Sequence, residues 1–214
     1  MYQVWRQVAK AREIDQVWVA TDNDEIARAA EVFGAQVVVT SRKPRTGSDR
    51  VAEALAELAG DIVINVQADC VGLKAAALNR VIRAMKRDRS VQFATLARSI
   101  KDDRELFDPG VVKVVVDRTD RALWFSRYPL PYLQRAGTGP RSRQFGYLAH
   151  IGVYFFRRAA LKAYARWNQT KLEKAESLEQ LRILENGGAM RVFRTAARII
   201  SIDKPEDLKK ISGR

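Results

Sequence analysis

Hydrophobic and polar positions follow two different periods along the first hundred residues, and stretches of the two kinds alternate. Apolar residues three or four positions apart predict helices, and short β-branched or apolar runs predict strands. The expected elements, in chain order, are helix Tyr2–Arg12, strand Val17–Ala20, helix Asp22–Phe33, strand Gln36–Thr40, helix Ser48–Leu58, strand Ile62–Val66, helix Lys74–Arg87 and strand Gln92–Ala97. This order is typical of βαβ units and predicts an α/β fold with a mixed, mostly parallel sheet flanked by helices.

Residues that favour helix ends support several of these boundaries. Asp22, followed three residues later by Glu25, has the spacing of a capping box, and Gly34 follows the expected last turn. Ser48 is expected to cap the next helix. The strand Ile62–Val66 is almost entirely apolar, which is typical of a buried strand in a parallel sheet.

The pattern changes in the second half of the chain. Val111–Val116 and Ala122–Ser126 are separated only by a short polar turn, which predicts a hairpin. The segment Tyr128–Phe145 is rich in Pro, Gly and Arg and predicts a long surface loop. The remaining expected elements are strand Ile151–Phe156, helix Ala159–Arg166, helix Lys174–Glu185, strands near Val192 and Ile199, and a last helix from Pro205 behind a cap at Asp203. We therefore expect one domain over residues 1–214, with a hairpin subregion at about 108–170.

Composition limits the class of protein. With 214 residues and 47% hydrophobic content, the chain can bury a substantial core without disulfides. Cys70 is the only cysteine and His150 the only histidine, which excludes an internal disulfide and a metal site built from several Cys or His side chains. No run of about 18 apolar residues predicts a membrane span, and the first residues lack the regions of a signal peptide. We expect a cytoplasmic protein with no membrane partner.

Charge adds an expectation about ligands. The chain has 38 Lys and Arg against 25 Asp and Glu, a formal net charge of +13. The basic residues are scattered, and their short clusters are not interleaved with the aromatic residues that stack on nucleic-acid bases. A solvated surface together with a site for a small anionic molecule explains the charge, and nucleic-acid binding remains a less favoured alternative.

Polar residues at the end of an expected buried strand are the first candidates for chemistry. Asn65, Gln67 and Asp69 close or follow the strand Ile62–Val66, and ligands of open α/β sheets bind beyond the carboxyl ends of strands. Magnesium usually takes one or two protein carboxylates together with substrate phosphates, so Asp69 is a candidate ligand and Asp203 a possible second one. The alternative is that these residues only cap the following helix, and their spacing does not decide between the two.

Eight segments give a more specific indication. In chain order they read VWVATDNDEIA, TGSDRVAEA, IVINVQADC, VVKVVVD, ALWFSRYPLPY, HIGVYFFR, ESLEQLRILENG and SIDKPEDL. This set resembles the CMP-3-deoxy-manno-octulosonate synthetases over nearly the whole chain. The resemblance implies a nucleotidyltransferase fold of the glycosyltransferase-A type and a homodimer. It also implies that CTP and an acidic 3-deoxy sugar give CMP-sugar and pyrophosphate, for lipopolysaccharide precursors.

The resemblance also implies roles for individual residues. The residues that would hold Mg²⁺ against the phosphates, and so act in catalysis, are Asp69 and Asp203. The residues that would bind the nucleotide are Gly47, Ser48, Arg50, Asn65 and Gln67. The residues that would contact the sugar are Arg127, near its carboxylate, and His150, Tyr154, Glu179 and Gln180. Ordinary alternatives are a core position for Tyr154, a solvated helix face for Glu179 and a structural role for His150.

Two departures from the family pattern concern the reaction centre. The family usually opens with a strand and a basic, glycine-containing loop that grips the triphosphate, whereas the sequence starts at the helix that should follow them. We therefore expect an N-terminally incomplete domain, an unpaired sheet edge and weakened phosphate binding. In addition, Ala68, Cys70 and Val71 replace the family's Gly, Glu and Pro.

Three functions stay open at this point. The first is a 3-deoxy-manno-octulosonate cytidylyltransferase-like enzyme. The second is activation of a related acid sugar, such as an 8-amino analogue or a sialic acid. The third is a non-catalytic relative of the fold, acting as a binding or partner protein, which the joint absence of the N-terminal loop and of a Glu at the position of Cys70 favours.

Overall fold

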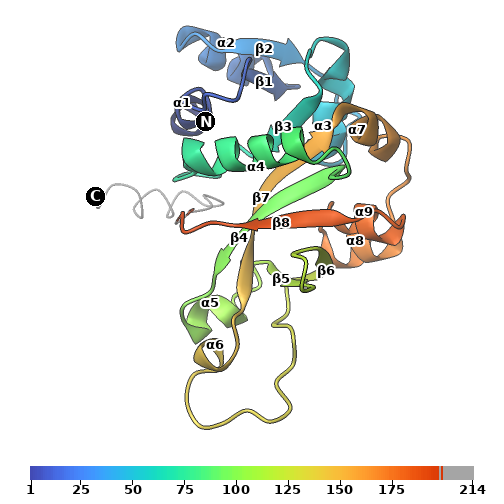
Figure 1. Cartoon of the computed structure of the whole chain (residues 1–214). Helices are drawn as coiled ribbons and strands as arrows, with labels where there is room; N and C mark the ends of the chain where they lie inside the picture. Colours follow the sequence, from blue (N-terminus) through green and yellow to red (C-terminus); the bar gives the residue numbers. More distant parts are fainter. Residues whose placement is uncertain (198, 200–214) are drawn as a thin grey trace.

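Two β-sheets form the centre of the protein in the computed structural model, which describes residues 1–197 and 199. A parallel pair consists of β1 (Trp18–Thr21) and β2 (Gln36–Val39). The larger sheet contains β3 (Ile62–Val66), β4 (Phe93–Ser99), β5 (Lys113–Val116), β6 (Ala122–Ser126), β7 (Leu148–Arg157) and β8 (Met190–Arg194). Its order is β6-β5-β7-β4-β8, and β3 pairs with β7 as well (Figure 1).

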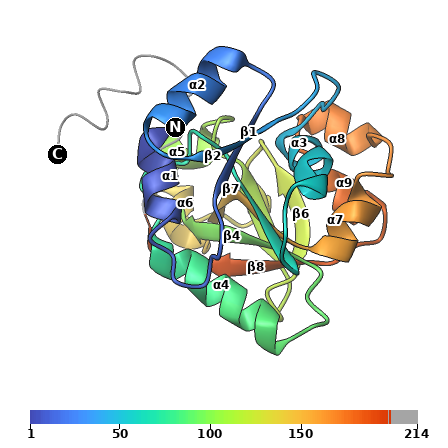
Figure 2. The same cartoon turned by 90° about the horizontal axis from the view of Figure 1, so that it is seen from above.

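The helices lie around these sheets (Figure 2). They are α1 (Tyr2–Val8), α2 (Asp24–Val32), α3 (Gly47–Glu53), α4 (Ala75–Arg87), α5 (Asp103–Phe107), α6 (Arg141–Gln144), α7 (Arg158–Tyr164), α8 (Lys171–Glu176) and α9 (Leu181–Glu185), with a 3₁₀ turn at Ala54–Ala56. Within the described residues no helix is long and apolar enough to cross a membrane.

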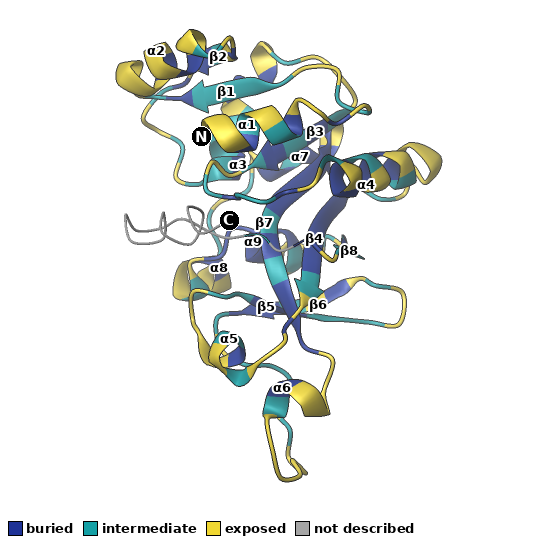
Figure 3. Ribbon diagram, turned by 90° about the vertical axis from the view of Figure 1, so that its left-hand side faces the viewer, coloured by how far each residue is buried: buried dark blue, intermediate teal, exposed yellow. Residues whose placement is uncertain are grey.

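The long strand β7 separates two hydrophobic clusters. Its side chains alternate between the two faces of the sheet, so Tyr154 and Phe156 join one cluster while Val153 and Phe155 join the other. The first cluster includes residues of α7 and α9, and the second includes residues of α1 and α4. Figure 3 shows β7 and β4 as buried strands through the middle of the molecule. Both faces of this sheet are therefore covered.

The expected mixed sheet flanked by helices is confirmed, but the prediction of mostly parallel strands needs correction. Among the described ladders only β1–β2 and β4–β8 are parallel. The strand β7 runs antiparallel to β3, β4 and β5, and β5 and β6 form the expected antiparallel hairpin. The apolar sequence of β3 reflects burial on both faces, and burial on both faces does not specify strand direction.

Several expected boundaries were wrong. Asn23, not Asp22, caps α2, because its side chain accepts hydrogen bonds from the two amides of Glu25 and Ile26. Thr46, not Ser48, caps α3, and that helix ends at Glu53.

The helix expected at Lys174–Glu185 is interrupted. Ser177 adopts a left-handed conformation with φ 52°, which ends α8 and separates it from α9. The loop expected from residue 128 to 145 contains the short helix α6.

Candidate functional site

The candidate site lies on the same face of the large sheet as the Tyr154 side chain. In the strand register, Tyr154 of β7 is paired with Asn65 of β3 on one side and with Thr95 of β4 on the other. Two positions before Tyr154, Gly152 lies beneath Gln67, because a Cβ built on Gly152 would be 3.7 Å from the Gln67 amide carbon. The sheet register therefore brings the predicted residues of β3 and β7 together.

The first turn of α3 approaches this face closely. The Asn65 side-chain amide donates to Ser48 Oγ over 3.1 Å. A Cβ on Gly47 would lie only 3.2 Å from Asn65 Nδ2, so only glycine fits there without a shift of its neighbour. Ser48 is buried, and its backbone N–H donates to Glu179 Oε2 over 2.9 Å. The predicted nucleotide loop and the predicted sugar segment are thus directly joined.

Glu179 and Gln180 form the other wall of the site. The Tyr154 hydroxyl donates to Gln180 Oε1 over 3.0 Å. Within the described structure, Glu179 Oε1 and Gln180 Nε2 are buried and have no partner at hydrogen-bond distance, although the Thr46 and Ser48 hydroxyls lie near the Glu179 carboxylate and act to lower its pKa. Buried polar atoms normally have partners, so one free acceptor and one free donor indicate a place where a polar ligand can bind.

Burial also shifts the pKa values of two side chains at this site, Glu179 and Tyr154. Loss of solvation raises the pKa of Glu179, although the Ser48 amide partly opposes that change. Loss of solvation, with the nearby Glu179 carboxylate as a smaller contribution, raises the pKa of Tyr154 well above its ordinary value. Tyr154 therefore remains a hydroxyl donor at any physiological pH.

The raised pKa of Glu179 predicts a pH dependence of stability. The carboxyl group ionises more easily in the unfolded chain, so ionisation favours unfolding as the pH rises above the ordinary value of 4.5. We expect wild type to lose up to about 1.4 kcal/mol of unfolding free energy per pH unit relative to Glu179→Gln, until the folded-state pKa is passed.

Urea denaturation of both proteins at pH 5 and pH 8 measures this difference. The exposed Glu31→Gln substitution controls for the loss of one surface carboxylate. Parallel pH profiles for wild type and Glu179→Gln would contradict the expected cost of burying this carboxylate.

His150 lies next to this wall as a neutral ring. Its ring centroid is 5.5 Å from that of Tyr154 and 5.0 Å from that of Phe125. The side chain keeps some exposure, but the surrounding protein desolvates the ring and lowers the pKa of His150 to about 3. The Thr95 hydroxyl lies 2.9 Å from its Nε2 atom. At neutral pH this histidine acts through hydrogen bonds and not as a cation.

Asp69 and Cys70 follow β3 and differ in burial. Asp69 is half-buried, whereas Cys70 is 5% exposed and belongs to the cluster that contains α4. The Cys70 sulfur is 3.8 Å from the Gly152 carbonyl oxygen. Within the described residues no group of three or more His, Cys, Asp or Glu side chains is arranged around a common metal position. One carboxylate still fits Mg²⁺ held mainly by substrate phosphates, and Asp203 lies outside the described residues.

Two predicted cationic residues have protein partners. Arg50 bonds with Thr40 Oγ1 over 2.5 Å and pairs with Asp22 over 3.3 Å, so it links α3 to the ends of β1 and β2. The Arg127 guanidinium donates to backbone carbonyls of Glu176, Pro109 and Ser177. A contact between Arg127 and a sugar carboxylate stays a prediction.

Comparison with known proteins identifies the family. A family model described as cytidylyltransferase matches residues 1–211. The chain belongs to the cytidylyltransferase family. A 3-deoxy-manno-octulosonate cytidylyltransferase of Geobacter metallireducens is 41% identical over 213 residues, which are 97% of this chain and 84% of that protein. The protein of that name from an Anaeromyxobacter species is 44% identical over 203 residues, which are 94% of this chain and 80% of its own length.

Solved structures agree with this cytidylyltransferase assignment. A CMP:2-keto-3-deoxy-manno-octonic acid synthetase complexed with CTP is 32% identical and has a TM-score of 0.87, with 98% of this chain and 84% of that chain covered. HddC from Yersinia pseudotuberculosis, at 12% identity and a TM-score of 0.66, shares the fold alone. The expected nucleotidyltransferase fold is confirmed.

The sequence reasoning missed two residues that shape the site. Thr95 pairs with Tyr154 across the sheet and contacts His150, and Arg182 anchors α9, whose N-cap residue is Gln180. In the sequence, Thr95 is an ordinary β-branched strand residue, so no local signal distinguishes it as a site residue. Arg182 is part of the LEQLR segment and could have been singled out there.

Proposed function

We propose that this chain binds CTP and an acidic 3-deoxy sugar of the 3-deoxy-manno-octulosonate type, and transfers CMP to the sugar. The main support is that Ser48, Asn65, Tyr154, Glu179 and Gln180, from four separate motifs, meet in buried contacts that leave polar atoms available for a ligand. The names of the relatives support the choice of nucleotide and sugar.

The reaction needs positioning and charge neutralisation more than covalent help from the protein. The anomeric oxygen of the sugar forms a bond to the α-phosphorus while the bond to pyrophosphate breaks, and the hydroxyl proton is released. Bound Mg²⁺, with Asp69 and Asp203 as proposed ligands, would supply positive charge at the phosphates. Asn65 and Gln67 would orient the nucleotide at the end of β3, since correct alignment contributes much of such a rate.

The sugar would lie against the wall formed by Tyr154, Glu179 and Gln180. A hydroxyl of the sugar can donate to Glu179 Oε1, and another sugar oxygen can accept from Gln180 Nε2. Such hydrogen bonds in a buried site favour a polyhydroxylated ligand over an apolar one.

We expect Gln180→Ala to weaken binding of 3-deoxy-manno-octulosonate, in the presence of CTP, by ~1 kcal/mol or more, because hydrogen bonds in a buried site are lost. Tyr154→Phe should weaken it by a similar amount, since the phenol no longer holds the Gln180 side chain. Isothermal titration calorimetry measures both effects.

Tyr147→Phe is the matched control. Tyr147 is also buried, its hydroxyl donates to the Pro131 carbonyl over 3.0 Å, and it belongs to a different hydrophobic cluster from Tyr154. Unchanged affinity in Gln180→Ala and Tyr154→Phe would move the sugar site elsewhere.

One observation favours a second candidate, a non-catalytic relative. Cys70, at the position of the family's Glu, belongs to an apolar cluster instead of offering a carboxylate to the phosphates. A non-catalytic relative would bind CTP and the acid sugar yet release no pyrophosphate at any Mg²⁺ concentration. Assays with an 8-amino analogue and a sialic acid separate the related sugar specificities.

A cytoplasmic homodimer is part of the proposal. Large apolar side chains are exposed on β6 and the following loop, including Tyr128 at 75%, Tyr132 at 74% and Leu123 at 58%. This loop extends from the lower end of the molecule in Figure 1. Exposed aromatic residues of this kind are enriched in protein interfaces.

We expect Tyr128→Asp with Tyr132→Asp to shift the protein from dimer to monomer in sedimentation experiments, because both changes bury charge in the proposed interface. Val32→Asp is the control, since Val32 is 89% exposed on α2 and distant in sequence from that loop. A wild-type protein that sediments as a monomer at every concentration would rule out this dimer.

A further inference from the structure

Arg182 is a fully buried cation in the first turn of α9. Its side chain is 2% exposed. Two nitrogens contact the Asp49 carboxylate, over 2.6 Å and 3.2 Å. Two contacts reach the Glu173 carboxylate, over 2.8 Å and 2.6 Å. The guanidinium carbon also lies 4.4 Å from the centroid of the Tyr164 ring. One side chain therefore joins α3, α7, α8 and α9.

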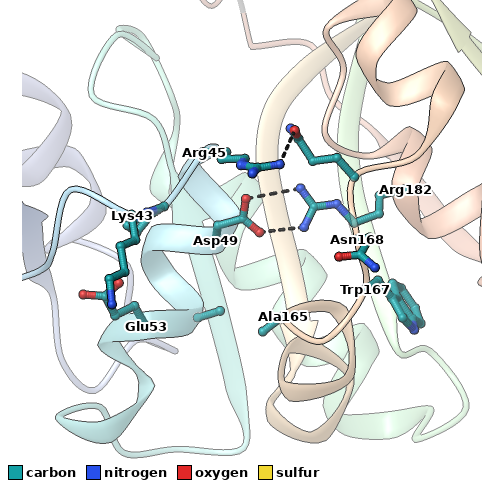
Figure 4. A pocket seen from close by; sticks show the side chains of 11 residues that line it. Lys43, Arg45, Asp49, Glu53, Ala165, Trp167, Asn168 and Arg182 are labelled. Atoms are coloured by element: carbon teal, nitrogen blue, oxygen red, sulfur yellow. Dashed lines mark hydrogen bonds and ion pairs between the residues drawn. The ribbon is translucent and has the colours of Figure 1, made fainter.

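The contacts of Arg182 connect the two halves of the candidate site. Asp49 directly follows Ser48 in α3, on the nucleotide side. Arg182 itself lies two residues after Gln180, on the sugar side. Figure 4 shows Asp49 and Arg182 facing each other across the gap between α3 and the later helices, with both carboxylate oxygens of Asp49 bonded.

This connection runs beside a second one. The Ser48 amide donates to Glu179, so adjacent residues of α3 bind two positions of the segment 179–182. The Ser48 contact uses a carboxylate that is also predicted to receive the sugar. The Arg182 contact with Asp49 uses no predicted ligand-binding atom.

The geometry of Arg182 is hard to replace. A guanidinium binds two carboxylates at once through its planar fork, whereas an ammonium group offers a compact charge without that fork. Hydrogen bonds to Glu173 and Asp49 outweigh the effect of burial and raise the pKa of Arg182, so it stays charged. Removal of the guanidinium leaves two carboxylates without their shared partner.

We propose that Arg182 is a positioning residue that holds the nucleotide-side helix α3 against the sugar-side segment 179–182, and thereby couples the binding of CTP to the binding of the acid sugar. This proposal rests on the proposed function, because it assigns CTP and the sugar to the two sides. Movement of α3 upon binding one ligand would be transmitted through Asp49 to Arg182. By thermodynamic linkage, the factor by which CTP strengthens sugar binding must equal the factor by which the sugar strengthens CTP binding.

A purely structural role would give a different result, and Arg157 provides the comparison. Arg157 is also buried and charged, and it pairs with Asp61 over 2.7 Å and donates to the Met85 carbonyl. It connects β7 to α4, and its hydrogen-bond and ion-pair partners in the described structure, Asp61, Met85 and Asp88, all lie outside α3 and α9. Arg157→Met therefore removes a comparable buried guanidinium without touching the connection between the two sides.

The experiment compares wild type, Arg182→Lys, Arg182→Met and Arg157→Met. Calorimetry measures the dissociation constant for 3-deoxy-manno-octulosonate with and without saturating CTP. We expect CTP to strengthen sugar binding in wild type and Arg157→Met alike. The strengthening factor should fall at least ~10-fold in Arg182→Met and by an intermediate amount in Arg182→Lys. A factor that is unchanged in Arg182→Met, or lowered equally in Arg157→Met, would overturn the proposal.

Amide hydrogen exchange tests the same inference without any ligand. Arg182→Met, or Arg182→Lys if the former does not fold, should speed exchange at Ser48 and in residues 178–182 more than Arg157→Met does. Equal exchange rates in these segments for the Arg182 variant and Arg157→Met would overturn the positioning role, even if the chain transfers CMP. Wild type that binds neither CTP nor the sugar would instead overturn the proposed function, and the exchange result would still decide on Arg182.

Discussion

Asp69→Asn is expected to slow pyrophosphate release by at least ~10³-fold, because phosphoryl transfer depends on charge neutralisation and alignment of the phosphates. Asp69 is half-buried and lies just beyond β3, two residues after Gln67 in the chain. An amide cannot replace a carboxylate as a strong ligand for Mg²⁺. The loss should appear mainly in kcat, with a higher Mg²⁺ concentration needed for half-maximal rate.

The measurement is pyrophosphate release with CTP, 3-deoxy-manno-octulosonate and a titration of Mg²⁺. Asp88→Asn is the matched control. Asp88 is exposed and follows the last turn of α4, whereas Asp69 lies before the first turn of that helix. It should leave both the rate and the Mg²⁺ dependence unchanged. Near wild-type turnover in Asp69→Asn would show that the phosphates bind elsewhere.

Phe156→Ala is expected to lower the free energy of unfolding by about 3–5 kcal/mol, since a buried aromatic ring is lost and a cavity remains. Phe156 is 1% exposed. Its ring centroid lies 5.9 Å from Phe93, 6.4 Å from Tyr154 and 5.9 Å from Tyr164. Because the ring packs against Tyr154, the cavity should also loosen the wall formed by Tyr154, Glu179 and Gln180 and weaken the proposed sugar binding.

Urea denaturation measures this loss, and an unchanged slope of free energy against urea would show that the folded state keeps its compactness. Phe107→Ala serves as control, because Phe107 is 48% exposed at the end of α5. It should cost less than ~1 kcal/mol. A similar loss in both variants would mean that Phe156 is not part of the main core.

Most of the elements could be predicted from periodicity, and their exact limits could not. The segment from Lys174 to Glu185 contains no Gly or Pro, so its local signals favour one continuous helix. The break at Ser177 is stabilised by a distant residue, since Arg127 donates to the carbonyls of Glu176 and Ser177. Tertiary contacts of this kind cannot be predicted from the local sequence pattern.

The sequence motifs predict which residues belong to the candidate site, but not which of them contact one another. Ser48 and Glu179 were both singled out, but their direct hydrogen bond depends on how α3 packs beside α9. Arg50 was expected at the nucleotide, and its pairing with Asp22 joins two segments whose proximity only the fold reveals. Motif order along the chain identifies members of a site, whereas their mutual contacts follow from packing.

The surroundings of Thr95 determine which nitrogen of His150 carries the proton. A hydroxyl has one hydrogen, and Thr95 Oγ1 lies 2.8 Å from the Val153 carbonyl oxygen, which can only accept. When Thr95 donates to that carbonyl, the neutral imidazole must donate from Nε2 to Thr95, over 2.9 Å. The tautomer is then fixed, and Nδ1 is left as an acceptor. A ligand group that meets His150 must therefore bring its own proton, which a sugar hydroxyl does and an ionised sugar carboxylate does not.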